Sequence, residues 1–389
     1  MAGAIIIGVA AAVVAWLSGH GAWPLAVPFA ALWIASPAIA RRASLSPVVA
    51  GRLPVSDADA RALRMSARRT WRFFESFVTP ADHMLPPDNF QEDPVPVLAH
   101  RTSPTNLGLY LLSVVSARDF GWIGTIEAIE RLETTLATMS GLARFRGHFY
   151  NWYDTQDLRP LDPQYVSSVD SGNLAGHLIA LANACREWRD LPFADLRRLA
   201  GIGDALELTR EETDHRRDGR RTQTVTWHQF DDAHSLLAAG VRRAPVDGED
   251  IAERLASLGA QAETIADIAR ALSIERGDDT GADMLFWAEA TRSSIATHRR
   301  DLDQSTAATT AVKARLKILE EIARATALAM EFGFLLDRDR KLLSIGYRVP
   351  EGTLDPSCYD LLASEARLAS FMAIAKGDLP ARHWFHLGR

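Results

Sequence analysis

The chain has 389 residues, a net charge of −6 and two cysteines, and 47% of its residues are hydrophobic against 24% charged. This length suits one large domain or two ordinary ones, and the composition is typical of a folded protein. The negative charge provides no global basic field for nucleic acid, and Cys185 and Cys358 lie too far apart in sequence for a disulfide framework or paired metal ligands.

The start of the chain contains no charged side chain before Arg41 and forms two apolar runs, about 2–17 and 23–40. A membrane helix needs about 20 apolar residues, so the second run is long enough and the first is marginal. Arginines cluster from Arg41 onward, and the positive-inside rule then puts the rest of the chain in the cytoplasm. We therefore expect a transmembrane helical hairpin over residues 1–42, with a lipid bilayer as partner and the body on the cytoplasmic side.

Two alternatives remain for these apolar runs. A cleaved signal peptide would need basic residues before the first run, and none precede it. A buried helical hairpin would also accommodate runs of this length.

Residues 43–104 are expected to form a linker helix followed by an ordered loop. Apolar residues recur at helical spacing, and Ser56 with Asp59 suits a helix start, so a helix is predicted over 56–78. The prolines of the following segment, 79–106, exclude a long regular element and predict an extended ordered loop.

The body of the chain, residues 105–389, is predicted to be mainly helical. Amphipathic helices are expected over 105–117, 123–139, 171–188 and 359–375. Residues 190–330 are rich in Ala, Arg and Glu, which predicts surface helices with solvated outer faces. Helix pairs joined at one end by long aromatic and acidic loops are typical of an α/α barrel or toroid, in which the site lies where the loops converge.

The segment 147–178 concentrates aromatic rings and carboxylates before a predicted helix. A sugar ring has apolar C–H faces and a polar edge, so its pocket needs flat aromatic rings together with carboxylates and amides. The side chains that supply this mixture are Trp152, Tyr153, Asp154, Asp157, Asp162, Tyr165, Asp170 and Asn173. Other roles stay open, because Asp170 could cap the helix, Asp162 could form a turn with the next proline, and Trp152 could belong to the core.

Motifs for other chemistries are missing from the sequence. There is no GxGxxG after a strand, no GxxxxGKS/T and no GxSxG, which argues against nucleotide-binding loops and a serine nucleophile elbow. His148 and His177 are too far apart for an HExxH-type zinc pair, so neither a metal nor a cofactor is expected. The basic runs 215–221 and 298–301 lack interleaved aromatic residues, and no nucleic-acid partner is expected.

Six longer motifs carry a specific family resemblance. They are LPPDNFQE (85–92), HRTSPTNLGLYLLS (100–113), ARDFGWIG (117–124), GHFYNWYDT (147–155), YVSSVDSGNLAGHLIAL (165–181) and YDLLASEARLASFMAIAKGDLPARHWFHLGR (359–389). Together they resemble the middle region of the cyclic β-1,2-glucan synthases, which are large proteins of the bacterial inner membrane. The resemblance covers nearly the whole chain in order and is weakest in the charged helical section.

In that family, the N-terminal part carries membrane spans and a glycosyltransferase, and a C-terminal phosphorylase-like domain controls chain length. A middle glucoamylase-like domain closes the glucan ring by transglycosylation. The resemblance therefore implies that this chain is a fragment, with a membrane hairpin followed by a partial glucoamylase-like (α/α) toroid over 105–389. It also implies a β-glucan polysaccharide and the missing parts of the same synthase as partners, and a location at the bacterial inner membrane.

The resemblance also implies substrate-binding roles for the matching positions. These are Asp88, Asn89, Arg101, Asn106, Trp152, Tyr153, Asp154, Asp170, Asn173, Tyr359, Asp360, Glu365 and Arg367. The family's retaining mechanism uses an acid/base and a nucleophile. The resemblance places both beyond Arg389, so no catalytic residue is assigned firmly within the chain. Glu365 and Arg367 could instead form structural ion pairs on a helix.

Three functions are compatible with these observations. The first is the carbohydrate-binding portion of the transglycosylating domain of a membrane-bound cyclic β-1,2-glucan synthase. The second is an inactive, membrane-anchored glucan-binding truncation. The third is a self-contained glycoside hydrolase that uses Asp154 and Asp170 as its pair, since a hairpin between them could bring the two carboxyl groups to catalytic distance.

Overall fold

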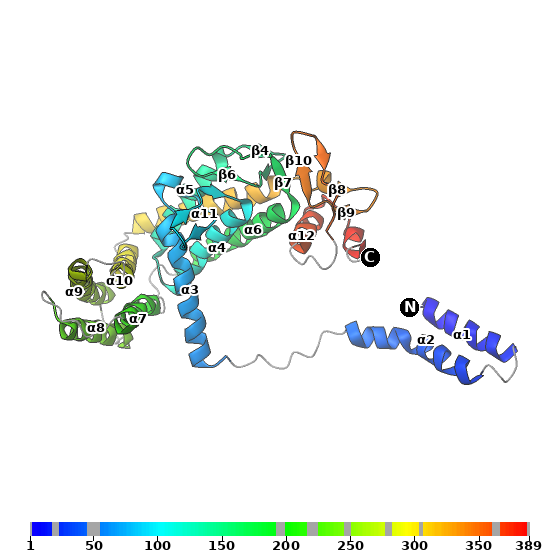
Figure 1. The fold of residues 1–389 in the computed structure, drawn as a ribbon, viewed down its shortest axis with the longest axis horizontal. Helices are drawn as coiled ribbons and strands as arrows, with labels where there is room; N and C mark the ends of the chain where they lie inside the picture. Colours follow the sequence, from blue (N-terminus) through cyan, green and yellow to red (C-terminus); the bar gives the residue numbers. More distant parts are fainter. Residues whose placement is uncertain are drawn as a thin grey trace. The chain divides into compact units, whose positions relative to one another are not determined.

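The structure is a computed structural model that describes residues 2–17, 23–44, 55–191, 199–215, 225–244, 250–276, 282–302, 306–359 and 366–386. The chain divides into two compact units, residues 1–61 and residues 62–389. Helices dominate the described residues, as predicted, and the strands are all short (Figure 1).

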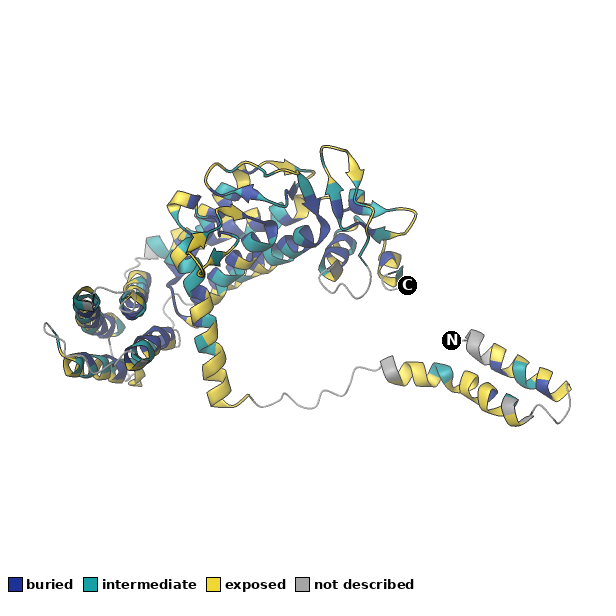
Figure 2. Cartoon of the chain, viewed as in Figure 1, coloured by how far each residue is buried: buried dark blue, intermediate teal, exposed yellow. Residues whose placement is uncertain are grey.

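Unit 1 consists mainly of two helices, α1 (Ala2–Leu17) and α2 (Trp23–Ser44), which pack against each other. Gly8 permits their close approach, because a Cβ added there would lie 2.7 Å from a side-chain carbon of Ile34. Among the residues of this pair whose burial is described, the well-buried ones are all small: Gly8, Ala15 and Ala30. Many of the larger apolar side chains are exposed (Figure 2).

The prediction of a transmembrane hairpin over residues 1–42 is wrong. Within the described residues, every helix is either too short or too polar to cross a bilayer. The 16 residues of α1 rise only about 24 Å, against a hydrocarbon core of about 30 Å. The 22 residues of α2 include Pro28 and Pro37 and end with Arg41 and Arg42, which lowers the apolar character of the helix. The expected bilayer partner and cytoplasmic placement depended on this hairpin.

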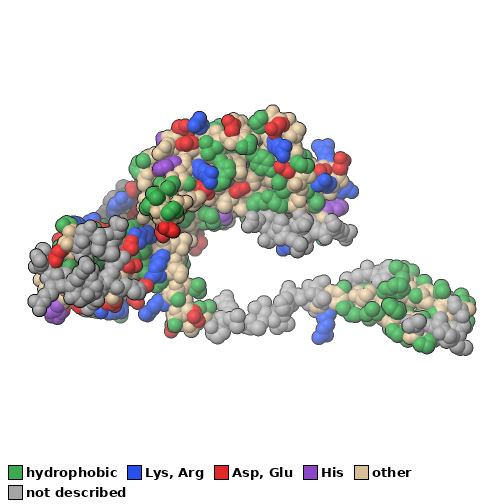
Figure 3. Space-filling model, viewed as in Figure 1, with side chains coloured by type: hydrophobic (Ala, Val, Ile, Leu, Met, Phe, Trp, Pro, Cys, Tyr) green, Lys and Arg blue, Asp and Glu red, His purple; other side chains and the backbone are tan. Residues whose placement is uncertain are grey.

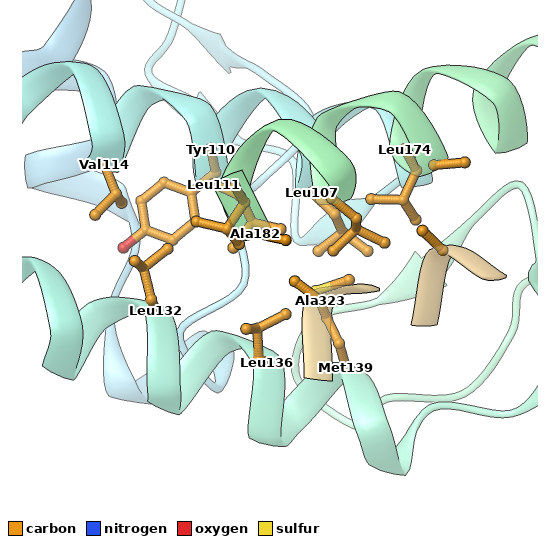
Figure 4. Close-up of a cluster of buried hydrophobic side chains, with 14 of the residues drawn as sticks. Leu107, Tyr110, Leu111, Val114, Leu132, Leu136, Met139, Leu174, Ala182 and Ala323 are labelled. Atoms are coloured by element: carbon orange, nitrogen blue, oxygen red, sulfur yellow. The ribbon is translucent and has the colours of Figure 1, made fainter. Parts of the chain in front are cut away.

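Unit 2 contains a main helical layer with one large core. Its helices are α3 (Asp57–Phe77, which begins within unit 1), α4 (Pro104–Phe120), α5 (Thr125–Gly141), α6 (Ser168–Asp190), α11 (Thr306–Ala329) and α12 (Ala366–Lys376). Leu107 and Leu111 of α4, Leu136 of α5, Leu174 of α6 and Ala323 of α11 meet in this core (Figure 4). The predicted helices over 105–117, 123–139 and 171–188 are therefore confirmed; the first and third are longer than predicted by a few residues, and the second is shifted by two residues towards the C-terminus.

A second helical group fills most of the charged section. It comprises α7 (Ala200–His215), α8 (Trp227–Arg242), α9 (Ile251–Arg276) and α10 (Ala282–Leu302). These helices are more than a solvated surface layer, because Leu206, Phe230, Leu258 and Ile295 bury a core of their own. The group is tied to the main layer by Asp301, whose carboxylate accepts the first backbone N–H groups of α5 at 2.6 and 3.0 Å.

The strands pair in short antiparallel ladders. Four pairs are β1 (Phe90–Gln91) with β2 (Val97–Leu98), β3 (Arg101–Thr102) with β6 (Tyr153–Asp154), β4 (Arg144–Phe145) with β5 (His148–Phe149), and β8 (Leu336–Asp337) with β9 (Leu342–Leu343). In a three-stranded sheet, β10 (Gly346–Arg348) lies between β7 (Tyr165–Ser167) and β11 (Thr353–Leu354) and pairs with both. Single-turn 3₁₀ helices cover Pro80–Asp82 (η2) and Gly333–Leu335 (η5), and a longer one covers Ala381–His386 (η6). The loops between the helices are thereby held in ordered positions.

Candidate functional site

The β3–β6 ladder brings together two loop segments that are distant in sequence. Arg101 lies opposite Asp154 in the ladder, and Thr102 lies opposite Tyr153. This pairing sets the Arg101 guanidinium over the indole ring of Trp152, with 4.6 Å between the guanidinium carbon and the ring centroid. The arginine thereby covers one face of the half-buried tryptophan.

The first turns of α4 and α6 adjoin this pair. Ser103 caps α4 and Ser167 caps α6, and each serine oxygen accepts the N–H three residues further on. The helix predicted from residue 171 therefore begins three residues earlier, and its cap is Ser167 rather than Asp170. Thr105 of α4 donates a hydrogen bond of 2.5 Å to Asp170 Oδ1 of α6, which joins the two helix starts.

Hydrogen bonds connect these groups in two chains, and the contact between the Arg101 guanidinium and the Trp152 ring joins the two chains. Asp88 accepts from Arg101 Nη2 at 2.9 Å and from Asn106 Nδ2 at 3.3 Å. With the Asn151 amide oriented to satisfy both neighbours, its nitrogen donates to Asp170 Oδ2 at 3.3 Å, and its oxygen accepts from Trp152 Nε1 at 3.1 Å. We call the seven residues of these two chains the loop cluster: Asp88, Arg101, Thr105, Asn106, Asn151, Trp152 and Asp170.

The loop cluster combines one aromatic surface with carboxylate, amide and hydroxyl groups. The carboxylates of Asp88 and Asp170 are both only partly buried, so hydrogen-bond capacity remains available to a ligand. This is the combination that recognition of a sugar requires, because the indole ring matches the C–H face while the polar groups match the hydroxyls. Five of the predicted substrate-binding residues belong to the cluster: Asp88, Arg101, Asn106, Trp152 and Asp170.

Two predicted residues beside Trp152 have structural contacts of their own. Tyr153 is fully buried, and its hydroxyl accepts from Tyr150 N and donates to Ala143 O, while burial raises its pKa. Asp154 Oδ1 accepts the backbone N–H groups of Gln156 and Asp157 at 2.8 and 3.1 Å. The first therefore packs in the core and the second stabilises its own turn.

The remaining predicted residues occupy the edges of the site or lie further away. Asn89 donates to Asp88 Oδ2 at 3.0 Å, and Asn173 lies half-buried one turn along α6 from Asp170. Tyr359 is half-buried, and its N–H donates to Leu343 O. Arg367 lies exposed in the first turn of α12. Asp360 and Glu365 lie outside the described residues.

Sequence reasoning did not single out Asn151, and it weighed Thr105 only as part of a motif. Asn151 directly precedes Trp152, so the signal in the sequence was an amide side chain next to an aromatic ring. Tyr165 belongs to the aromatic segment, and its pKa is raised chiefly by burial and also by the nearby negative charges of Asp355, Tyr359 and Asp170.

Across the parts of the chain that the structure describes, no group of His, Cys, Asp and Glu side chains could hold a metal ion.

Comparison with known proteins identifies the family of this segment. No family model matches the chain. The chain is 46% identical, over 366 residues and 94% of its length, to the cyclic beta-(1,2)-glucan synthase NdvB of Rhizobium meliloti (strain 1021). Over this segment the chain belongs to the cyclic β-(1,2)-glucan synthase family. The chain spans only 13% of the length of that glucan synthase.

Proposed function

We propose that the loop cluster binds a β-glucan chain, and that this segment forms the carbohydrate-binding part of the transglycosylating domain of a cyclic β-(1,2)-glucan synthase. The observation that carries the proposal is the half-buried Trp152, held between the Arg101 guanidinium and the Asn151 amide, beside the carboxylates of Asp88 and Asp170. The family relationship supports a β-glucan as the ligand, because the relative is named as a synthase of that polymer.

The geometry indicates how a sugar would be oriented. Arg101 occupies one face of the indole ring, so a pyranose ring would stack on the other face. The guanidinium is held in place by Asp88, which accepts from both Nε at 3.1 Å and Nη2 at 2.9 Å. A fixed stacking surface costs less entropy on binding than a mobile one, so Asp88 and Arg101 would preorganise Trp152 for the ligand.

A self-contained hydrolase that uses Asp154 and Asp170 receives less support. Two hydrogen bonds from the following backbone engage Asp154 Oδ1, and Asp154 therefore serves the turn after β6. Asp170 is held by Thr105 as part of the loop cluster. The contacts of both aspartates are typical of residues that position loops or bind a ligand. They are therefore compatible with the glucan-binding role, which requires no cleavage chemistry.

The test is the affinity of Trp152→Ala for a linear β-1,2-glucan oligosaccharide. Loss of one stacking surface is worth on the order of 1 kcal/mol, so we expect an affinity about fivefold to tenfold lower in calorimetric titration. Because Trp152 is only half-buried, the melting temperature should change little.

The matched control is Trp384→Ala, which removes a tryptophan that is 40% exposed and lies outside the loop cluster. This variant should keep the affinity of the unmodified chain. The proposal fails if both variants weaken binding equally. It also fails if Trp152→Ala melts far below the unmodified chain, since loss of a core tryptophan costs about 3–5 kcal/mol.

A further inference from the structure

A second cavity in unit 2 shares no residue with the loop cluster. It has a volume of about 950 Å³ and lies among three chain segments. The turn between β4 and β5 contributes Arg146, the connection from α11 to β9 contributes six residues between 331 and 341, and the stretch that ends in η6 contributes six residues between 378 and 386. On the face shown in Figure 3, basic and acidic side chains gather where β8 and β9 lie.

Positive charge predominates in the cavity lining. Arg146, Arg338, Lys341 and Arg382 line it, and none of the four forms an ion pair within the described parts of the chain. The two carboxylates of the lining do not cancel this charge. Asp378 already binds Lys376 Nζ at 3.1 Å and the N–H of Phe332 at 2.8 Å. This leaves Glu331 as the one lining carboxylate that faces these four cations.

Two of these cations occupy backbone positions that favour glycine. Arg146 has φ = 49° in the β4–β5 turn, and Lys341 has φ = 60° in the β8–β9 turn. A Cβ makes this left-handed conformation unfavourable, and glycine would adopt it without strain. Strained positions of this kind concentrate at functional sites, where the side chain compensates for its conformational cost. Both strained turns carry a cation, and both cations line the same cavity.

Buried histidines anchor the two turns. His148 Nε2 donates to Glu331 O at 2.7 Å, and Glu331 N donates to Arg146 O at 3.2 Å, which fixes the first turn. His383 Nδ1 lies 3.0 Å from Lys341 O, which fixes the second. His383 is itself held at 3.0 Å by Ser370 Oγ. The cations are thus carried by a preorganised framework.

Apolar side chains also line the cavity. They are Leu336, Leu379, Pro380 and Phe334, and the Phe334 ring packs edge-on against Phe145 and Tyr347 and lies 5.1 Å below the Arg146 guanidinium carbon. A ligand that matches both kinds of lining would have a strongly negative group and a compact ring with apolar faces. Arginine is suited to oxyanions that accept two parallel hydrogen bonds, such as phosphate.

We propose that this cavity binds a phosphate group, either free or carried by a small molecule such as a hexose phosphate. The proposal does not depend on the glucan role of the loop cluster. Calorimetric titration of the full chain at low salt would use inorganic phosphate, a hexose 6-phosphate and the neutral hexose as probes. We expect binding of a phosphate-bearing probe, no binding of the neutral hexose at this cavity, and weaker binding as salt rises. A hexose phosphate that binds more tightly than phosphate identifies the carried form, and equal affinity identifies the free ion.

The critical variants are Arg146→Gly and Lys341→Gly, which remove a cation and relieve the backbone strain together. Each should weaken phosphate binding about tenfold while leaving the melting temperature equal or higher. Arg382→Gln tests the charge alone, at a position without a positive φ. Arg340→Ala is the matched control, because Arg340 neighbours Lys341 but does not line the cavity. The proposal is overturned if neither phosphate probe binds. It is also overturned if the two glycine variants bind phosphate as tightly as the unmodified chain or have a lower melting temperature. A loss of affinity in Arg340→Ala as large as in the glycine variants would overturn it as well.

Discussion

At the scale of single residues, His148 shows how burial controls protonation. Its ring is fully buried, and it meets the rings of Phe332 and Phe334 edge-on. Nε2 donates to Glu331 O, which fixes the neutral tautomer. The pKa of His148 is lowered to about 4, chiefly by burial and also by the nearby Lys376 charge, although the hydrogen bond to Glu331 and the charge of Asp378 oppose the shift.

This histidine predicts a loss of stability in mild acid. The unfolded chain takes up a proton on His148 below about pH 6.5, whereas the folded chain does so only below about pH 4. The stabilising contribution is therefore complete above pH 6.5 and is lost as the pH falls towards 4, with about 2 kcal/mol lost between pH 7 and pH 5. Urea unfolding of the unmodified chain and of His148→Gln at these two pH values would measure it. Equal losses of unfolding free energy in the two proteins would contradict this assignment.

At the scale of the elements, the approach of two helices depends on glycine. Gly172 of α6 faces α12, and a Cβ added there would lie 2.5 Å from the Cα of Ala369. Since that atom belongs to the backbone, the clash could be relieved only by moving α12. The helix that carries Arg367 is thus seated by the absence of a side chain on α6.

Gly172→Ala should therefore lower the free energy of unfolding by about 1–3 kcal/mol, which is the usual cost of overpacking. Gly141→Ala is the control, because Gly141 is the last residue of α5 and a Cβ there would meet nothing within 4 Å. The control should be neutral or stabilising by up to about 1 kcal/mol, since alanine restricts the unfolded chain. Chemical denaturation of both variants tests the comparison, and a Gly172→Ala protein as stable as the control would refute it.

At the scale of the whole molecule, the two units differ in what they bury. Unit 2 contains all three hydrophobic core clusters, which draw their residues from 65–379. Among its described residues, unit 1 buries little beyond Gly8, Ala15 and Ala30 and leaves many apolar side chains exposed. The folding free energy of unit 2 should therefore be independent of the two N-terminal helices.

Removal of residues 1–54 should leave the unfolding transition of unit 2 unchanged. All the cores of that unit remain, and burial of apolar surface is the dominant stabilising contribution. Thermal unfolding followed by circular dichroism, for the full chain and for residues 55–389, would measure the difference. A markedly lower midpoint in the shortened protein would show that the first helices support unit 2.

The sequence by itself determined the features that depend on neighbouring residues. Helical periodicity is complete within a few turns, so the sites of α4, α5 and α6 could be predicted closely. The family could be recognised because its motifs are contiguous, and the aromatic, acidic segment around Trp152 was visible for the same reason. The membrane prediction failed at this same local level, because apolar composition does not determine where a helix ends or how its prolines and arginines offset its apolar runs.

Tertiary structure decided the features that depend on segments distant in the chain. Trp152 is half-exposed, whereas the adjacent Tyr153 is buried. The sequence could not show which of the two side chains is buried, because the β3–β6 pairing decides which face of this short extended segment meets the core. The loop cluster needs Asp88, Arg101 and Asp170 to meet from three segments, and the phosphate cavity gathers its cations from three others. Such encounters follow from the packing of whole helices and the closure of loops, and no local pattern of residues encodes them.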